Sequence, residues 1–306
     1  MKVLCAMSGG VDSSVAALEL LEAGHQVVGL TMRLWGGASD TGCCSIADVD
    51  DARRVAQQLG IDHLVFNFTD DFDRHVVEPY VAAHARGITP NPCIECNRHL
   101  KFARLSERAD LLGFDAVATG HHARIVEHDG ARYVARGADV AKDQSYVLYT
   151  MDQDQLGYIT FPLGNLIKPE VRQLARIFGL PVADKEESQE ICFVGNQSYA
   201  QFVAKRRPDV TVPGDVVDTA GIAIGEHKGL VHHTVGQRRG LGIARQEPLF
   251  VIRLEPATNR VVVGSRGEAA ARRIALNGAV LPEPKTPVAE GHAVDVIVAE
   301  IMRRPP

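Results

Sequence analysis

The chain has 306 residues, of which 45% are hydrophobic and 23% charged, a composition that suits a globular protein of about two domains. It has no run of about 18 apolar residues, and its N-terminal apolar stretch is too short for a signal peptide, so we exclude a membrane-spanning protein and expect a cytoplasmic one. The net charge of −5 gives no sign of a generic nucleic-acid binder, but residues 1–204 carry 18 basic and 27 acidic side chains, whereas residues 205–306 carry 15 and 11.

The first part of the chain alternates short apolar runs with segments in which apolar residues have helical spacing. The expected strands are 2–7, 26–32, 64–68 and 116–119, and the expected helices are 11–23, 45–59, 72–86 and 100–112. A hairpin is expected at 124–135. Strands that alternate with helices of this length predict an α/β fold, a doubly wound parallel sheet covered on both faces. Ligands of such sheets bind at the carboxyl ends of the strands.

From about residue 198 the chain changes to short strands between glycines. After an amphipathic segment at 199–206, strands are expected at 231–234, 249–254, 260–263 and 294–299, with a linker marked by Pro282, Pro284 and Pro287. This pattern predicts hairpins or a small barrel. We therefore expect three domains: a doubly wound one at 1–198, a central β-rich one at 199–270 and a third at 271–306.

A glycine loop, Ser-Gly-Gly-Val-Asp-Ser-Ser at 8–14, follows the first expected strand and opens the first helix. Backbone N–H groups and the helix dipole create an anion site there, and glycines let a phosphate approach the backbone closely. The loop has no lysine, so it is not the Gly-Lys-Ser/Thr loop that binds β- and γ-phosphates. Asp12 would repel a triphosphate unless Mg²⁺ bridged them; the alternative is an ordinary glycine turn in which Asp12 caps the helix.

The whole string resembles the pyrophosphate loop of the ATP pyrophosphatases, which cleave ATP between its α- and β-phosphates and transfer AMP to a carbonyl oxygen. Two more residues are placed to contact such a nucleotide. Met32 ends the second expected strand, and Gly120 follows the strand at 116–119. Each also has an ordinary explanation, because methionines fill cores and glycines form turns.

Six cysteines are too few for a disulfide scaffold in a chain of this length. Cys93 and Cys96 are two residues apart in a Pro-containing segment that we expect to lie between two helices, and Cys192 is far along the chain. Such thiols can form a redox pair, or three thiolates can hold an iron–sulfur cluster with one open iron. Structural zinc needs a fourth ligand, which could come from His99, His121 or His122.

Seven segments together resemble the bacterial tRNA-specific 2-thiouridylase (MnmA) family, whose members thiolate the wobble uridine, U34, of certain tRNAs. In chain order they are 8–14, 42–45, 89–101, 118–121, 142–146, 191–193 and 236–242. The resemblance runs from residue 1 to about residue 264. It implies an ATP-dependent tRNA sulfurtransferase with an adenine nucleotide alpha hydrolase-like fold, in which the β-rich domain docks tRNA.

The resemblance also implies roles for single residues. The residues expected to contact ATP, with Mg²⁺, are Ala6, Met7, Ser8, Gly9, Gly10, Val11, Asp12, Ser13, Met32 and Gly120. The residues expected to contact tRNA are Asn91, Pro92, Cys93, His121, Lys142, Asp143 and Gln144. Cys192 would carry a persulfide that delivers sulfur to C2 of the adenylated uridine, and Cys96 would attack that persulfide, releasing sulfide or closing a Cys96–Cys192 disulfide. A sulfur donor such as a cysteine desulfurase relay is the expected partner, and the expected oligomeric state is a monomer.

Two departures from the family leave alternatives open. Cys93 stands where many members carry aspartate, and it completes a set of three thiols. A [4Fe-4S] cluster on Cys93, Cys96 and Cys192 could therefore deliver sulfide instead of a persulfide. The chain stops at Pro306, where members continue through a C-terminal β-barrel, so we expect residues 271–306 to form an incomplete barrel, or the chain to be a fragment. Two other functions are an amide-forming ligase with the same loop, which needs no paired thiols, and a non-catalytic tRNA-binding or sulfur-carrier protein.

Overall fold

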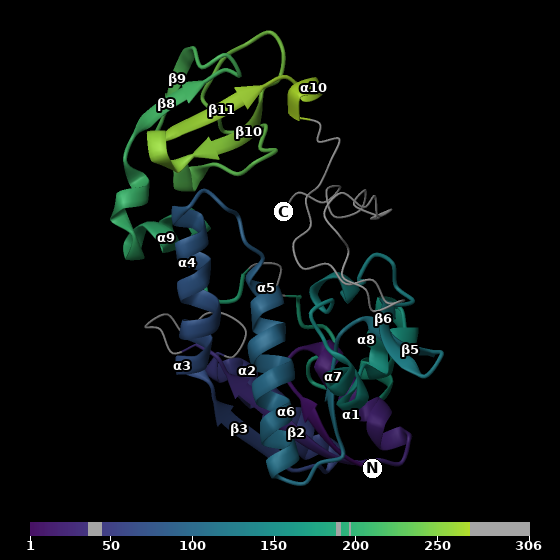
Figure 1. Ribbon diagram of the computed structural model, residues 1–306. Coiled ribbons are helices and arrows are strands. Elements are labelled where there is room, and N and C mark those ends of the chain that lie inside the picture. The colour runs from purple at the N-terminus through teal and green to yellow at the C-terminus, as the bar shows by residue number, and fades with distance from the viewer. Residues whose placement is uncertain (36–44, 188–190, 196, 270–306) are drawn as a thin grey trace.

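The computed structural model describes residues 1–35, 45–187, 191–195 and 197–269 (Figure 1). Several expectations lie outside these residues: the segment 42–44, the strand at 294–299, the linker prolines and the domain at 271–306. No helix in the described part is long and apolar enough to cross a membrane.

Five parallel strands form the main sheet, in the order β3-β2-β1-β4-β7. Their bounds are β1 Lys2–Ala6, β2 Gln26–Arg33, β3 His63–Asn67, β4 Ala116–Thr119 and β7 Ile159–Thr160. Side chains alternate across the sheet, so that Leu4 packs in the core on one face and Val3 and Cys5 pack in the core on the other. Both faces are thus buried, and the predicted doubly wound fold is confirmed.

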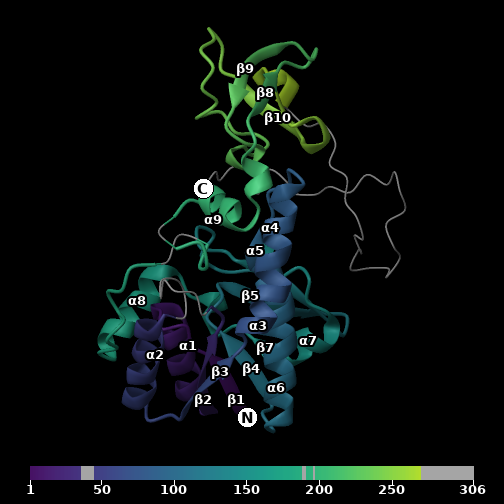
Figure 2. The same cartoon turned by 90° about the vertical axis from the view of Figure 1, so that its left-hand side faces the viewer.

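Helices cover both faces of this sheet (Figure 2). One face carries α1 (Val11–Glu22), α2 (Ile46–Leu59) and α8 (Lys168–Ile177), and the other carries α4 (Glu78–Ala85) and α6 (Leu105–Leu111). The shorter helices are α3 Thr69–Phe72, α5 Pro92–Glu95, α7 Gln153–Tyr158 and α10 Arg266–Ala269. Short 3₁₀ turns lie at η3 Ser145–Val147, η4 Pro162–Asn165, η5 Pro208–Thr211 and η7 Pro256–Thr258.

Two of the expected helices contain π-helical segments. The helix expected at 72–86 is formed by α3, the π-helical η1 (Asp73–Val77) and α4. The helix expected at 100–112 starts earlier, at Pro92, and runs through α5, the π-helical η2 (Cys96–Arg104) and α6.

Asn91 and Pro92 explain the early start of the second of these helices. Asn91 caps it by accepting a hydrogen bond from the N–H of Cys93 at 3.0 Å, and Pro92 takes the first helical position, where an N–H is not needed. Cys93 and Cys96 therefore lie in the first turns of a helix. The expectation that they lie in a segment between two helices is wrong.

The second sheet has four strands in the order β10-β11-β8-β9, and it confirms the predicted β-rich region. Its strands are β8 Gly214–Val217, β9 Ala223–His227, β10 Phe250–Glu255 and β11 Arg260–Gly264. The last two correspond to the strands expected at 249–254 and 260–263. Val216, Val251 and Val261 form the centre of a separate small core.

The strand expected at 231–234 is wrong, because this segment forms the 3₁₀ turn η6 (Leu230–His232). Gly229, at φ +135°, precedes the turn, and a Cβ there would lie 2.7 Å from Cα of Thr211. Leu230 packs into the small core of the second sheet, whereas Val231 packs into the core of the main domain. The N–H groups of His232 and His233 donate to the carbonyls of Gly229 and Leu230, at 3.2 Å and 3.0 Å. These turn bonds use backbone groups that a paired strand would need for its neighbour.

The two domains meet around α9 (Tyr199–Arg206), which lies between the end of α4 and the second sheet (Figure 1). Thr89, just after α4, donates a hydrogen bond to Thr234 at 3.2 Å. The hairpin expected at 124–135 is confirmed as β5 (Ala123–His128) and β6 (Ala131–Arg136). Its turn residues Asp129 and Gly130 have φ values of 50° and 75°, as a two-residue hairpin turn requires.

Candidate active site

The glycine loop connects β1 to α1, as the sequence predicts, and serine hydroxyls hold its shape. Ser13 Oγ accepts a hydrogen bond from the N–H of Ser8 at 3.0 Å, and Ser14 Oγ donates to the carbonyl of Gly10 at 2.9 Å. Gly9 has φ +73°, and a Cβ there would collide with the carbonyl oxygen of Asp48. The N-cap residue of α1 is Gly10, which has no side chain that could accept a hydrogen bond from the first N–H groups of the helix. The loop therefore has the backbone geometry of an anion site.

The other expected nucleotide contacts lie around this loop. Gly120 packs so closely on the start of α1 that a Cβ would lie 2.7 Å from the Ser13 nitrogen. Ala6 ends β1, and the N–H of Met7 donates to Leu30 at 2.7 Å. Met32, near the end of β2, is buried in the same core that Ala6 packs against. The structure thus gathers these residues at the carboxyl ends of β1, β2 and β4, and their contact with ATP stays a prediction.

Asp12 has protein partners that the sequence did not reveal. Lys168 Nζ lies 2.7 Å from both carboxylate oxygens of Asp12, and His122 Nε2 lies 3.3 Å from one of them. Burial alone would raise the pKa of Asp12, but hydrogen bonds from His122 and Lys168 and the charge of Lys168 lower that pKa overall. Lys168 is supplied by α8, and its side chain is 9% exposed. The loop sequence contains no lysine, but the fold places Lys168 of α8 beside it.

Glu187 joins the same group of charges. Its carboxylate lies 3.1 Å from Lys168 Nζ, 2.6 Å from Lys142 Nζ and 3.7 Å from Arg172. A second lysine, Lys185, binds the back of the loop, where its Nζ donates to the carbonyl of Gly9 at 3.0 Å and to two carboxylates of α2, those of Asp48 and Asp51. Within the segment 185–187, Lys185 therefore contacts the loop directly at Gly9, and Glu187 contacts Lys168, the partner of Asp12.

The segment expected to contact tRNA makes hydrogen bonds within the protein. Asp143 accepts from the N–H of Gly137 at 3.0 Å and from the hydroxyl of Ser145 at 2.8 Å, and Gln144 accepts from the N–H of His122 at 2.9 Å. Lys142 has 41% of its side chain exposed. These bonds order the segment beside the loop, and its contact with tRNA stays a prediction.

His121, another expected tRNA contact, is 7% exposed. Its ring lies 5.9 Å from those of Phe102 and Phe161, and its Nδ1 lies 2.7 Å from the hydroxyl of Thr119. Burial lowers the pKa of His121 well below its usual value, so the ring is neutral at physiological pH. In this structure His121 packs in the core beneath the site, and its role toward tRNA stays a prediction.

The four thiols in the described part of the chain fall into three environments. Cys5 is fully buried in β1, and burial raises its pKa to about 12, so it is unreactive at neutral pH. Cys96 and Cys192 are half-buried and pack against one core, the core that also holds Ala6 and Met32. Cys93 is exposed at the start of the same helix as Cys96. The chain thus folds so that two thiols far apart in the sequence pack against the same core.

A metal or cluster site is a separate question. Among the described residues, no three His, Cys, Asp or Glu side chains converge closely enough to hold a metal ion. Cys93, Cys96 and Cys192 are thus not gathered as such a group here, and a cluster on them stays an open alternative. The ring of His99 stacks on that of His75 at 4.7 Å. Asp12, the residue expected to meet Mg²⁺, is paired with Lys168, and its contact with Mg²⁺ stays a prediction.

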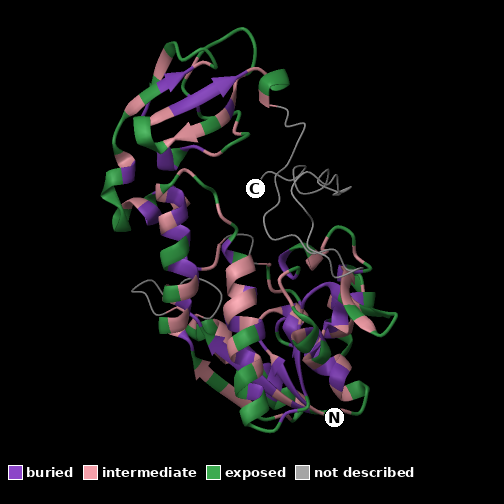
Figure 3. Ribbon diagram, viewed as in Figure 1, coloured by how far each residue is buried: buried purple, intermediate pink, exposed green. Residues whose placement is uncertain are grey.

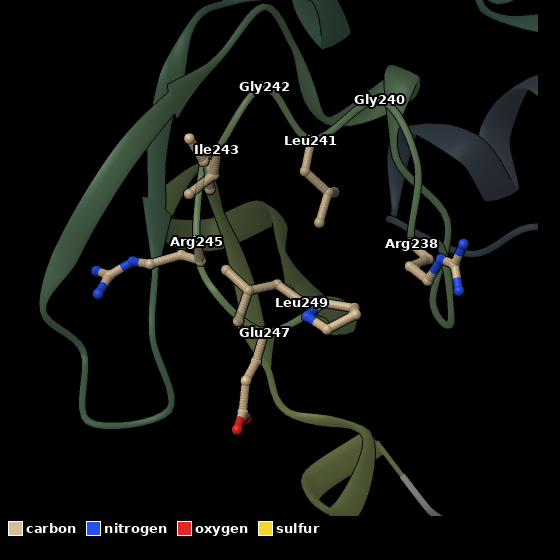
Figure 4. Close-up of a pocket in the computed structure, with 10 residues that line it drawn as sticks. Arg238, Gly240, Leu241, Gly242, Ile243, Arg245, Glu247 and Leu249 are labelled. Atoms are coloured by element: carbon tan, nitrogen blue, oxygen red, sulfur yellow. The ribbon is translucent and has the colours of Figure 1, made fainter.

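The second domain contributes a shallow cavity of about 540 Å³ along the loop 238–249. Figure 4 shows an apolar floor of Leu241, Ile243 and Leu249, with Arg238 and Arg245 on opposite sides. Glu247 also lines the groove, so two arginines and one carboxylate surround its apolar floor. Figure 3 shows that the loops of this domain are mostly exposed.

Comparison with known proteins identifies the family. The family described as tRNA methyl transferase HUP domain matches residues 1–196, and the tRNA methyl transferase PRC-barrel domain matches residues 200–265. A curated relative, tRNA-specific 2-thiouridylase MnmA from Chloroflexus aurantiacus, is 51% identical over 267 residues, 86% of this chain and 74% of the relative. The chain belongs to the tRNA-specific 2-thiouridylase (MnmA) family. A family member from Geobacter metallireducens is 49% identical over 277 residues, 87% of this chain and 75% of the relative. The resemblance inferred from the sequence is thus confirmed, and so is the enzyme class.

Two solved structures are more distant. The U34-tRNA thiolase NcsA from Methanococcus maripaludis with its [4Fe-4S] cluster has a TM-score of 0.41 and 18% identity, over 69% of this chain and 65% of that one. A 4-thiouridine synthetase in complex with RNA and ATP has a TM-score of 0.43 and 18% identity, over 68% of this chain and 50% of that one. At this distance neither structure assigns a residue or a cofactor to this chain.

Proposed function

We propose that this chain is an ATP-dependent tRNA 2-thiouridylase that adenylates O2 of U34 and then replaces it with sulfur carried as a persulfide on Cys192. The observation that carries the proposal is that Cys96 and Cys192 pack against one core together with Ala6 and Met32, which lie at the carboxyl ends of β1 and β2. Adenylation and sulfur transfer require a phosphate site and a thiol site within reach of one base, and this arrangement supports both. Membership of the MnmA family supports the same reaction.

The first step is adenylation. O2 of the uridine attacks the α-phosphorus of ATP, the bond to the bridging oxygen breaks, and pyrophosphate leaves with the electron pair, while the N3 proton passes to solvent. The first N–H groups of α1 and the hydroxyl of Ser8 are placed to donate to phosphate oxygens. The hydroxyl of Ser13 instead donates to the carbonyl of Gly10 at 3.2 Å and holds the loop in shape. Mg²⁺ would enter with the ATP and offset the charge of its phosphates. Lys168 keeps Asp12 from repelling them.

The second step is sulfur transfer. The terminal sulfur of the Cys192 persulfide attacks C2, and AMP leaves with the former O2. Cys96, as a thiolate, then attacks Sγ of Cys192, and the electron pair of the broken S–S bond stays on the sulfur bound to C2. The base takes up one proton from solvent, which replaces the proton that N3 lost in the first step. The products are 2-thiouridine and a Cys96–Cys192 disulfide, which an external dithiol reduces before a persulfide donor reloads Cys192. If Cys96 attacks before transfer, the persulfide instead releases sulfide, which adds to C2.

The tRNA contacts complete the proposal. The exposed Cys93 and the helix N-cap Asn91 lie at the start of the helix that carries Cys96, where they can contact the target base. Lys142 and the arginines around the groove of the second domain can bind phosphates of the tRNA. We expect the protein to act in the cytoplasm as a monomer.

The test supplies the chain with ATP, Mg²⁺ and unmodified tRNA, with a cysteine persulfide donor in one tube and sulfide in another, under anaerobic conditions. The tRNA is then digested and 2-thiouridine is measured by mass spectrometry. We expect product with the persulfide donor. Product that requires both sulfide and protein-bound iron would overturn the persulfide route in favour of a cluster. Pyrophosphate release without tRNA and with a Cys96→Ser variant would indicate an amide-forming ligase, and tRNA binding with no ATP cleavage would indicate a non-catalytic protein.

A further inference from the structure

Glu187 forms ion pairs with two lysines, one beside the glycine loop and one in the segment expected to contact tRNA. One is Lys168, whose Nζ also lies 2.7 Å from Asp12 in the first turn of α1, beside the expected phosphate site. The other is Lys142, which opens the segment expected to contact tRNA. The two oxygens of the Glu187 carboxylate separate these partners, since Oε1 lies 3.1 Å from Lys168 and Oε2 lies 2.6 Å from Lys142.

The two lysines differ in how solvent reaches them. Lys168 has 9% of its side chain exposed and faces the glycine loop, whereas Lys142 has 41% exposed. Arg172 is fixed by the carbonyls of Ala183 and Lys185 and adds a third cation, 3.7 Å from Glu187. Burial opposes ionisation of Glu187, but hydrogen bonds from Lys142 and Lys168 lower its pKa, so it is an anion at neutral pH.

We propose that Glu187 couples ATP binding to tRNA binding, because its carboxylate competes with the phosphates of both substrates for Lys168 and Lys142. The inference rests on the proposed function, since it requires both substrates to bind at this site. It makes Glu187 a positioning residue, which acts through the lysines and does not touch the reacting atoms.

Lys142, Lys168 and Arg172 share the two carboxylates of Glu187 and Asp12. With Glu187 ionised, the three cations and two carboxylates of this group leave one net positive charge; without Glu187 they leave two. When a tRNA phosphate takes Lys142, Glu187 loses one of the two lysines that hold its carboxylate in place, and the carboxylate turns away from Lys168 as well. ATP phosphates then reach a Lys168 that Glu187 has already left. Each ligand therefore lowers the cost of binding the other, and by linkage the effect is reciprocal.

The experiment measures the dissociation constant of α,β-methylene ATP, which cannot be cleaved between its α- and β-phosphates, by calorimetry with and without saturating unmodified tRNA. For the wild-type chain we expect tRNA to tighten binding of the analogue by about fivefold or more, the lower end of ordinary coupling. In Glu187→Gln the analogue should bind several-fold more tightly without tRNA, and tRNA should change its affinity by less than about twofold. Glu187→Asp, which keeps the charge, should retain part of the coupling.

Asp184→Asn is the matched control. It removes the same charge three residues earlier, but Asp184 is exposed and pairs only with Arg176 on the outer part of α8 among the described ion pairs. Its coupling should equal that of the wild type. Lys142→Met is a second variant in case Glu187→Gln folds poorly. It removes the lysine through which tRNA would act on Glu187, so tRNA should no longer change the affinity for the analogue.

The coupling is overturned if tRNA does not change the affinity of the wild-type chain for the analogue. It is also overturned if tRNA changes the affinity of Glu187→Gln by the same factor as that of the wild type. Weaker analogue binding by well-folded Glu187→Gln would also overturn it, because Glu187 would then be needed to place Lys168. A wild-type chain that binds both ligands but forms no 2-thiouridine would instead contradict the proposed function.

Discussion

Gly120→Ala tests whether the end of β4 must pack directly on the phosphate loop. The added methyl group would lie 2.7 Å from the nitrogen of Ser13 and 2.8 Å from the carbonyl carbon of Asp12, whereas ordinary contacts are about 3.5–4.0 Å. Either β4 or α1 must therefore shift by about 1 Å, and overpacking of this kind costs about 1–3 kcal/mol. Gly120 does not have a positive φ, so alanine brings no backbone strain and the loss reports the collision alone.

Gly157→Ala is the matched control for this prediction. Gly157 lies in α7, where a Cβ would meet only the end of the Arg132 side chain at 3.9 Å. Both variants restrict the unfolded chain in the same way, so the difference between their free energies of unfolding isolates the collision. We expect Gly120→Ala to be less stable than Gly157→Ala by about 1–3 kcal/mol in urea titrations, and its KM for ATP to rise. Equal stabilities with an unchanged KM would refute the close packing of β4 on the loop.

Three further predictions concern the thiols, pH and iron. Cys96→Ser and Cys192→Ser should abolish 2-thiouridine formation while tRNA-dependent pyrophosphate release continues; loss of both activities would place the thiols in adenylation. Because the pKa of Asp12 is lowered in the folded protein, its bonds to Lys168 and His122 stabilise the fold above the unfolded value of about 3.9 and are lost as the pH falls through the lower native value. The urea midpoint of the wild type should therefore fall more between about pH 5 and pH 3 than that of Asp12→Asn. Stripping iron with a chelator should leave persulfide-dependent thiolation unchanged, and activity that returns only with iron and sulfide would contradict the persulfide route.

Local patterns predict the main sheet well, because strand, loop and helix follow one another within a few residues. The loop after β1 and the two strands at 249–254 and 260–263 were found from apolar runs and glycines alone. The prediction of a strand at 231–234 failed because its apolar residues follow Gly229, whose positive φ and close approach to Thr211 turn the chain there. The sequence does not show that contact. The early helix start had a usable signal, an asparagine cap followed by proline at the first helical position.

The site was only partly predictable, for a different reason. The glycine loop and the cysteine motifs are short and can be read from the sequence. Lys168, Lys185 and Glu187 carry no motif of this kind, and the bond between Asp12 and Lys168 joins residues 156 positions apart. Only the doubly wound fold, which brings α8 beside α1, places that lysine at the loop. The sequence therefore did not reveal that the protein places a cation of its own beside Asp12, and Mg²⁺ at Asp12 stays a prediction.

The most direct test of the central claim follows one oxygen atom. Unmodified tRNA carrying ¹⁸O at C2 of U34 is incubated with the chain, ATP, Mg²⁺ and a persulfide donor, and AMP and the digested nucleosides are analysed by mass spectrometry. The account predicts that 2-thiouridine and ¹⁸O-labelled AMP form in equal amounts, because O2 leaves with the phosphate. Formation of 2-thiouridine with unlabelled AMP, or labelled AMP without any thiolated nucleoside, would contradict it.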